Sequence, residues 1–306
     1  MRRLGGISLP FHAPSTMKDA ERAALVRQQR IGIVSVVETF LTTAERQLGE
    51  DFLANGYVIR DVDDRPALDA MRAEIVGQVC HHLGRDLPNE HGGSLDNIHK
   101  LVPPEKLNDL RLAVYRKMNG KPWFRPTYYA LGRQSIDALV GNELAMQNRV
   151  NLSIQMPDDD SSLLDIHADV FGGETPFQIV QWLPLVDCRG TKSMFILPYP
   201  KSAEATKTLS RIGDGGMAEL YAQVESDLVW LDIPYGKTLI FSPNCLHGNI
   251  VNRVPETRWS MNCRFTGLFT PYASEEKKIG SYYLPITTRP VSLVGMRYEP
   301  PDEFEE

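Results

Sequence analysis

The chain has 306 residues, of which 42% are hydrophobic and 24% charged, and its formal net charge is −6. This composition is typical of a soluble globular protein with enough apolar material for a sizeable core. The negative charge argues against sequence-independent nucleic-acid binding, which requires a basic face. The four cysteines show no CxxC pairing, so we expect small buried thiols in a reducing compartment rather than zinc ligands or disulfides.

The ends and hydropathy of the chain bear on its location. The start, MRRLGGISLPFHAPS, lacks the apolar segment of a signal peptide, and no window approaches the roughly 18 continuous apolar residues of a membrane span. The sequence therefore predicts a cytoplasmic protein with no membrane partner and no nucleic-acid partner.

The first half of the chain has mainly helical patterns. Residues 1–15 contain paired glycines and two prolines, which predict an irregular arm. We expect helices over 16–30, over 42–54, from Asp64 onward and after Pro103-Pro104. A short strand is expected at 56–61, just before the helix that begins near Asp64. The helix that begins near Asp64 should bury one apolar stripe, formed by Leu68, Met71, Ile75 and Val79.

The second half changes to short runs of β-branched and aromatic residues separated by turn signals. We expect strands at 150–156, 177–183, 193–197, 228–233, 238–241 and 259–265, with a helical insertion around 203–224. Helices followed by a meander of strands predict an α+β domain whose second part is a β-sandwich or barrel. The predicted organisation is an arm at 1–15 and one domain at 16–306, comprising a helical part (16–147), a strand core (148–270) and an extended tail (271–306).

Three residues have the chemistry of an iron site. His167 and Asp169 stand two positions apart just after the first strand of the core, so in extended backbone their side chains share a face. His247 comes 78 residues after Asp169, following the strand at 238–241. Two imidazoles and one carboxylate suit the facial triad of a non-haem Fe(II) centre, which leaves coordination positions open. Taken singly, each of these residues has an ordinary structural explanation, and only their conjunction favours a metal site.

A candidate carboxylate clamp follows the second histidine. Arg258 lies eleven residues after His247, and Ser260 shares its strand face. A guanidinium pairs bidentately with a carboxylate, and a hydroxyl adds one further bond. Arg264, on the same strand parity, is a rival for the clamp, although a structural ion pair is its simpler interpretation. Gln155 lies in a strand expected to line the core, where its amide would contact a cofactor or simply be a buried hydrogen-bonded group.

The order HxD, distant His, Arg-x-Ser resembles that of the Fe(II)/2-oxoglutarate-dependent oxygenase superfamily. The helical first half, with Gly-Tyr-Val-Ile-Arg-Asp before a helix, is similar to the phytanoyl-CoA-dioxygenase-like branch. The resemblance implies a double-stranded β-helix (jelly-roll, cupin-like) core flanked by N-terminal helices. It also implies that His167, Asp169 and His247 bind Fe(II) and act in catalysis, and that Arg258, Ser260 and Gln155 bind the co-substrate 2-oxoglutarate.

The resemblance further implies a reaction class. Related halogenases lack the carboxylate ligand, so the presence of Asp169 favours hydroxylation of a small molecule by O₂, with release of succinate and CO₂. The substrate would be a sugar or a natural-product intermediate by fold-level analogy. Two alternatives stay open: a cupin-type isomerase or dioxygenase that does not use 2-oxoglutarate, and a jelly-roll binding protein without activity. The tail is long enough to reach a second subunit in a homo-oligomer.

Overall fold

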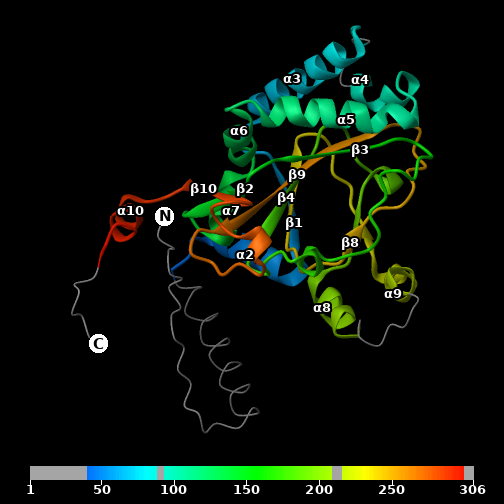
Figure 1. Ribbon diagram of the computed structural model, residues 1–306. Helices are drawn as coiled ribbons and strands as arrows, with labels where there is room; N and C mark the ends of the chain where they lie inside the picture. Colours follow the sequence, from blue (N-terminus) through cyan, green and yellow to red (C-terminus); the bar gives the residue numbers. More distant parts are fainter. Residues whose placement is uncertain (1–39, 88–92, 209–215, 300–306) are drawn as a thin grey trace. The chain divides into compact units, whose positions relative to one another are not determined.

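The computed structural model describes residues 40–87, 93–208 and 216–299 (Figure 1). The predicted arm, the predicted helix at 16–30 and the glycines within the predicted insertion at 213–215 lie outside the described residues. Internal contacts divide the chain between Gln47 and Leu48, and the sheets and the site described below belong to the part from Leu48 onward. Within the described ranges, none of the helices is both long and apolar enough to cross a bilayer.

The helices of the first half are α2 (Thr43–Asn55), α3 (Arg65–Leu83), α4 (Gly93–Asp96), α5 (Pro104–Asn119), α6 (Phe124–Ala130) and α7 (Arg133–Val140), and later come α8 (Tyr199–Thr208), α9 (Gly216–Val224) and α10 (Pro290–Gly295). In the first half, α2, α3 and α5 were expected from the sequence, whereas α4, α6 and α7 were not. Asp64 caps α3 by accepting a hydrogen bond from the backbone N–H of Ala67 at 2.9 Å. The predicted apolar stripe of this helix is fully buried.

The strands form two antiparallel sheets. They are β1 (Tyr57–Asp61), β2 (Leu144–Gln147), β3 (Asn151–Gln155), β4 (Gln178–Pro184), β5 (Phe195–Ile196), β6 (Val229–Trp230), β7 (Lys237–Phe241), β8 (His247–Gly248), β9 (Arg258–Gly267) and β10 (Tyr283–Thr287). The larger sheet has the order β1-β7-β4-β9-β2-β10, with β3 also paired to β9, and the smaller has the order β6-β5-β8. The long strand β9 pairs with β3 through its first half and with β2 through its second.

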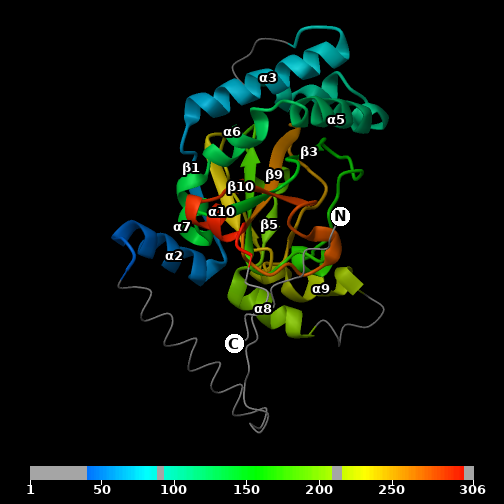
Figure 2. The ribbon, with the colours of Figure 1, turned by 60° about the vertical axis from the view of Figure 1, so that its left-hand side comes forward.

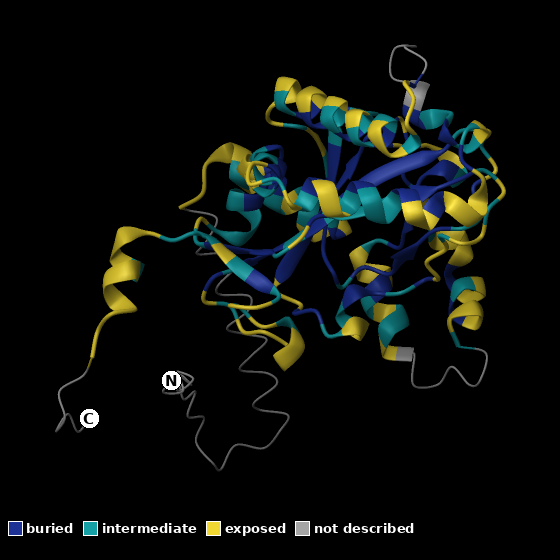
Figure 3. Cartoon of the chain, turned by 45° about the horizontal axis from the view of Figure 1, so that its top comes forward, coloured by how far each residue is buried: buried dark blue, intermediate teal, exposed yellow. Residues whose placement is uncertain are grey.

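Helices α3 and α5 lie over one face of the larger sheet (Figures 1 and 2). The two helices lie side by side, and α5 packs against β3. Figure 3 shows the strands buried and the outer sides of these helices exposed. Odd-numbered residues of β9 point toward the helices, and the indole Nε1 of Trp259 donates to the carbonyl of Leu95 at 3.0 Å. The even-numbered residues of β9, among them Arg258 and Arg264, therefore face the other side, where the smaller sheet lies.

The expected fold class is confirmed at its coarse level, since the chain combines helices with antiparallel sheets. Three strands, β2, β8 and β10, were not expected. β2 lies in the part predicted as helical, and β10 lies in the tail predicted as an extended covering, yet the two pair with each other in the larger sheet. The helical insertion begins earlier than expected, at Tyr199. The domain boundaries stay a prediction.

Candidate metal centre

The two histidines of the predicted triad are backbone partners. His167 and His247 form an antiparallel bridge, with hydrogen bonds of 2.9 Å and 2.8 Å between their backbone N–H and carbonyl groups. Residues directly opposite one another across an antiparallel pair present their side chains on the same side. Consequently the two rings lie with their centroids 4.4 Å apart, although 80 positions separate them in the sequence.

The carboxylate of the triad comes from the first residue of a short 3₁₀ turn, η2 (Asp169–Gly172). His167 is in the bridge and Asp169 opens the turn, so the simple strand alternation expected from the sequence holds only up to Ala168. The turn still directs the carboxylate back to the histidines, with Oδ1 of Asp169 3.8 Å from Nε2 of His167. One ligand atom from each of His167, Asp169 and His247 lies within 4.8 Å of the others. The chain thus brings the three residues together.

Each histidine is fixed in orientation by the backbone carbonyl two residues before it. Nδ1 of His167 lies 2.7 Å from the carbonyl oxygen of Asp165, and Nδ1 of His247 lies 2.9 Å from that of Cys245. A carbonyl only accepts, so both Nδ1 atoms carry the hydrogen, and both Nε2 lone pairs remain for a metal. Burial lowers the pKa of His247 to about 4, which keeps that ring neutral near pH 7.

A cavity of about 90 Å³ joins the triad to Arg258 and Arg264. Its apolar wall is formed by Leu164, Val180, Trp182, Met194 and Phe241. Its polar lining is formed by Ser153, Asn249 and Asn262 together with the triad and the two arginines. Strands of both sheets contribute side chains, so the cavity lies between the sheets. Such a volume holds several water molecules, and the apolar wall limits their number near the triad.

Arg258 is a buried cation without a carboxylate partner. Its side chain is only 3% exposed, and within the described residues no carboxylate lies within 4.0 Å of its guanidinium. The Nη1 atom donates to the carbonyl of Ser193 at 3.1 Å, and Nη2 donates to Oγ of Ser153 at 3.2 Å. Burial lowers the pKa of Arg258 to about 10, so the group remains charged near pH 7. An uncompensated buried charge is costly, so this position favours an anionic ligand.

Buried polar atoms without partners gather around this arginine. They are Nε of Arg258, Oγ of Ser260, Oε1 of Gln155 and Oγ of Ser193. Gln155 is the cross-strand partner of Arg258, Ser260 stands two residues further on the same face, and Ser193 supplies the carbonyl described above. Buried polar atoms without a hydrogen-bond partner are rare in proteins because they are costly, and a polar ligand bound here would supply the missing partners.

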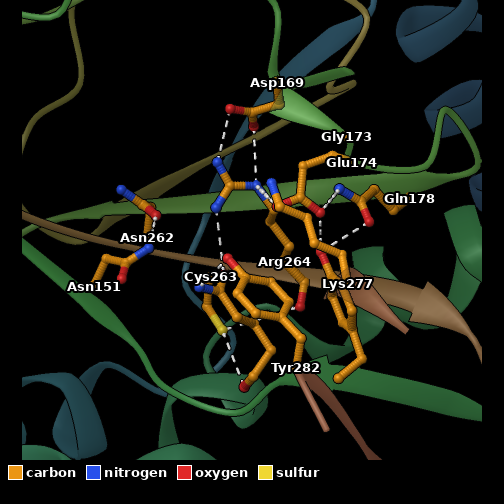
Figure 4. A network of polar contacts seen from close by, with 12 residues as sticks. Asn151, Asp169, Gly173, Glu174, Gln178, Asn262, Cys263, Arg264, Lys277 and Tyr282 are labelled. Atoms are coloured by element: carbon orange, nitrogen blue, oxygen red, sulfur yellow. Dashed lines mark hydrogen bonds and ion pairs between the residues drawn. The ribbon is translucent and has the colours of Figure 1, made fainter. Parts of the chain in front are cut away.

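Arg264 has a different environment from Arg258. Its guanidinium forms a bidentate ion pair with Asp169, in which Nη2 donates to Oδ1 at 2.7 Å and Nε donates to Oδ2 at 3.0 Å (Figure 4). Burial acts to raise the pKa of Asp169, but Arg264 and the two histidines outweigh it and lower that pKa. The interpretation of Arg264 as a member of an ion pair is therefore confirmed, and the ion pair is made with a residue of the triad itself. Sequence patterns gave no sign of that partner.

The remaining candidates lie away from the cavity lining. Gln155 and Ser260 are fully buried and are not among the residues that line the cavity, and Nε2 of Gln155 donates to the carbonyl of Ile250 at 2.7 Å. Asn262 and Asn249 were missed as lining residues, although Asn262 lies on the same strand face as Arg258 and alternation was a signal for it.

Comparison with known proteins concerns the fold. No protein-family model matches the chain, and no curated protein matches it either. A solved structure described as a non-haem monooxygenase, ThoJ in complex with Ni, superposes on 79% of this chain and 84% of its own with a TM-score of 0.50 and 15% identity. Its apo form gives the same values. The non-haem, α-ketoglutarate-dependent carbocyclase SnoK from nogalamycin biosynthesis covers 81% of this chain and 97% of its own, with a TM-score of 0.48 and 13% identity.

At such identities a likeness of this kind concerns the architecture and not the reaction or the substrate. The phytanoyl-CoA-dioxygenase-like branch stays a prediction. The chain shares its fold with a protein described as a non-haem monooxygenase.

Proposed function

We propose that this protein is a non-haem Fe(II)- and 2-oxoglutarate-dependent oxygenase that oxidises a small molecule. The observation that carries the proposal is the buried, carboxylate-free guanidinium of Arg258 in the same cavity as His167, Asp169 and His247. The triad supplies the donor set of an Fe(II) site, and Arg258 supplies a counter-charge for a dicarboxylate co-substrate. A cupin-type enzyme that does not use 2-oxoglutarate has no need of a buried cation in the same cavity as its metal.

The donor set fits Fe(II). Two neutral imidazoles with free Nε2 atoms and one carboxylate form a facial arrangement that leaves open positions for a chelating 2-oxo acid and O₂. When bound there, the iron with its co-substrate would supply the activation of O₂. One oxygen atom would enter succinate and the other the product, with the decarboxylation of 2-oxoglutarate providing two of the electrons.

The protein's own groups would position these reactants. Arg258 would hold the distal carboxylate of 2-oxoglutarate through its fork, and its unpaired Nε has a hydrogen to donate. Ser260 and Gln155, whose unpaired oxygens lie beside it, would complete that clamp either directly or through a bound water. The apolar wall of Trp182, Phe241 and their neighbours would exclude bulk water from the metal.

Two finer assignments belong to the same proposal. The position of the cavity between the two antiparallel sheets supports a double-stranded β-helix core. The presence of Asp169 supports hydroxylation over halogenation, because the carboxylate takes the coordination position that a halide would need.

The test is an anaerobic titration of the Fe(II)-loaded protein with 2-oxoglutarate, in which the weak visible charge-transfer band of the 2-oxo acid chelate is followed. A saturable band is expected, and succinate release in air would then report on candidate substrates. Iron binding without a band would favour the cupin-type alternative. A protein that binds no iron would contradict the assignment of the triad.

A further inference from the structure

Arg264 lies between two buried carboxylates. Besides its bidentate contact with Asp169, its Nε is 3.8 Å from Oε1 of Glu174, and its Nη1 donates to Oε1 of Gln147 at 3.3 Å (Figure 4). The side chain is 15% exposed, while Asp169 and Glu174 are 6% and 2% exposed. This guanidinium is therefore held from both sides, and it has little freedom to move away from Asp169.

Glu174 is itself fixed by three donors. Its Oε1 accepts from Nζ of Lys277 at 2.8 Å, and its Oε2 accepts from the hydroxyl of Tyr283 at 2.6 Å and from Nε2 of Gln178 at 3.1 Å. Lys277 comes from a 3₁₀ turn, η6 (Glu275–Lys277), Tyr283 from β10 and Gln178 from β4. A buried carboxylate with this many partners is a rigid support.

The geometry at Asp169 has a consequence for metal binding. Oδ1 lies near Nε2 of His167 and accepts one hydrogen bond from Nη2 of Arg264, which leaves it a lone pair for a metal, while Oδ2 accepts from Nε of Arg264. A carboxylate held in this manner can give one oxygen to a metal while the second stays engaged by the guanidinium. One-oxygen ligation is what leaves three positions open on an octahedral ion.

We propose that Arg264, supported by Glu174, is a positioning residue that holds Asp169 as a one-oxygen metal ligand. The inference rests on the proposed function, since it assumes that the triad binds a metal. It also ties the segment 275–283, distant in sequence from the triad, to the metal centre through Lys277 and Tyr283. Partners of this kind behind a ligand typically contribute about 10- to 100-fold in metal affinity.

The experiment measures Co²⁺ binding to the full-length protein and to the variants Arg264→Lys and Glu174→Gln, by calorimetry and by visible absorption. Lysine keeps the charge but not the fork, so we expect the Kd for Co²⁺ to rise by about 10-fold or more. The visible bands of the bound Co²⁺ should also change shape, because the freed carboxylate can then ligate through both oxygens. Glu174→Gln should have a smaller effect in the same direction, and the double variant should show less than the product of the two effects.

Arg253→Lys is the matched control, since it makes the same substitution in an exposed ion pair with Asp158. It should leave the Co²⁺ Kd within about twofold of the wild-type value, because Arg253 is not among the residues that line the cavity. An unchanged Kd and spectrum in Arg264→Lys would overturn the inference and leave the proposed function standing. If Arg264→Lys is not recovered folded, an unchanged Kd in the nearly isosteric Glu174→Gln overturns it equally. Failure of the wild-type protein to bind Co²⁺ or Fe(II) would instead contradict the proposed function.

Discussion

At the scale of single residues, the two arginines on one face of β9 have opposite electrostatic situations. Arg264 is neutralised by Asp169 and Glu174, whereas Arg258 has no carboxylate within reach in the described part of the chain. Spacing from His247 made Arg258 the candidate clamp and Arg264 its rival, but the sequence alone could not show this contrast. The contrast leads to a prediction about affinity and stability together.

Arg258→Met should weaken 2-oxoglutarate binding by about 100-fold, since two charge-assisted hydrogen bonds are lost. The ligand-free variant should be as stable as the wild type or more stable, because an uncompensated buried charge is replaced by an apolar side chain. Titration with 2-oxoglutarate and thermal unfolding without ligand measure the two effects. A lower Tm with unchanged 2-oxoglutarate affinity would mean that Arg258 is purely structural.

Lys192 supports the segment that carries Arg258. Its buried Nζ lies 2.5 Å from Oδ1 of Asp96 and 2.6 Å from Oε2 of Glu256, and Ser193, which holds Arg258, is the next residue. Lys192→Met should lower the free energy of unfolding by about 2–3 kcal/mol, at or below the lower end for a broken buried pair because both carboxylates are partly exposed.

Lys201 offers the control for that change. Its ion pair with Asp227 is exposed on both sides, so Lys201→Met should alter stability by less than about 1 kcal/mol. Denaturant unfolding of both variants gives the comparison. Equal effects would show that burial of Lys192 does not set the strength of its contacts.

At the scale of elements, β8 can pair closely only because a glycine follows the histidine. A Cβ on Gly248 would lie 2.7 Å from the carbonyl oxygen of Leu164 and 2.8 Å from Cζ of Phe195, distances that real Cβ atoms essentially never show. The backbone next to His247 is thus in direct contact with the loop that leads to His167. The two-residue strand depends on this contact for its position.

Gly248→Ala should therefore weaken Co²⁺ binding by at least about 10-fold, since the bridge between the histidines must shift. Gly77, exposed in the middle of α3 with nothing within 4 Å of an added Cβ, provides the control. Gly77→Ala should raise the free energy of unfolding by about 0.5–1 kcal/mol and leave metal binding unchanged. Wild-type Co²⁺ affinity in Gly248→Ala would show that the loop can move without cost.

The sequence predicts elements well where one local signal dominates. Asp64 and the apolar stripe after it gave α3, and the runs of β-branched residues gave β3, β4, β7 and β9. Strand β2 was missed because Leu-Ala-Met-Gln has helical propensity, and pairing with β9 and β10 overrides it. The partners of Arg264 were missed because Glu174, Lys277 and Tyr283 come from three separate segments that only the fold brings together.

At the scale of the whole chain, the tail takes part in the larger sheet. Tyr283 is 1% exposed and begins β10, whereas α10 has no buried residue. A chain ending after Gly280 should have a much lower Tm than the full-length protein, or should aggregate. Without β10 the edge of β2 is exposed, and Glu174 loses the hydrogen bond from Tyr283. A chain ending after Arg289 keeps β10 and loses only α10 and the residues beyond it, so it should unfold near the Tm of the full-length protein. Similar thermal unfolding of the two truncations would contradict the structural role of β10.

The backbone bridge between His167 and His247 gives a bound metal a further role, as a staple. An ion held by both rings would close a loop of about 80 residues, and cross-links over loops of that length restrict the unfolded chain most. A bound ion would therefore slow the separation of the two segments that carry His167 and His247, and loss of the ion would let both segments separate. Metal exchange and resistance to unfolding should then be two measures of a single opening event.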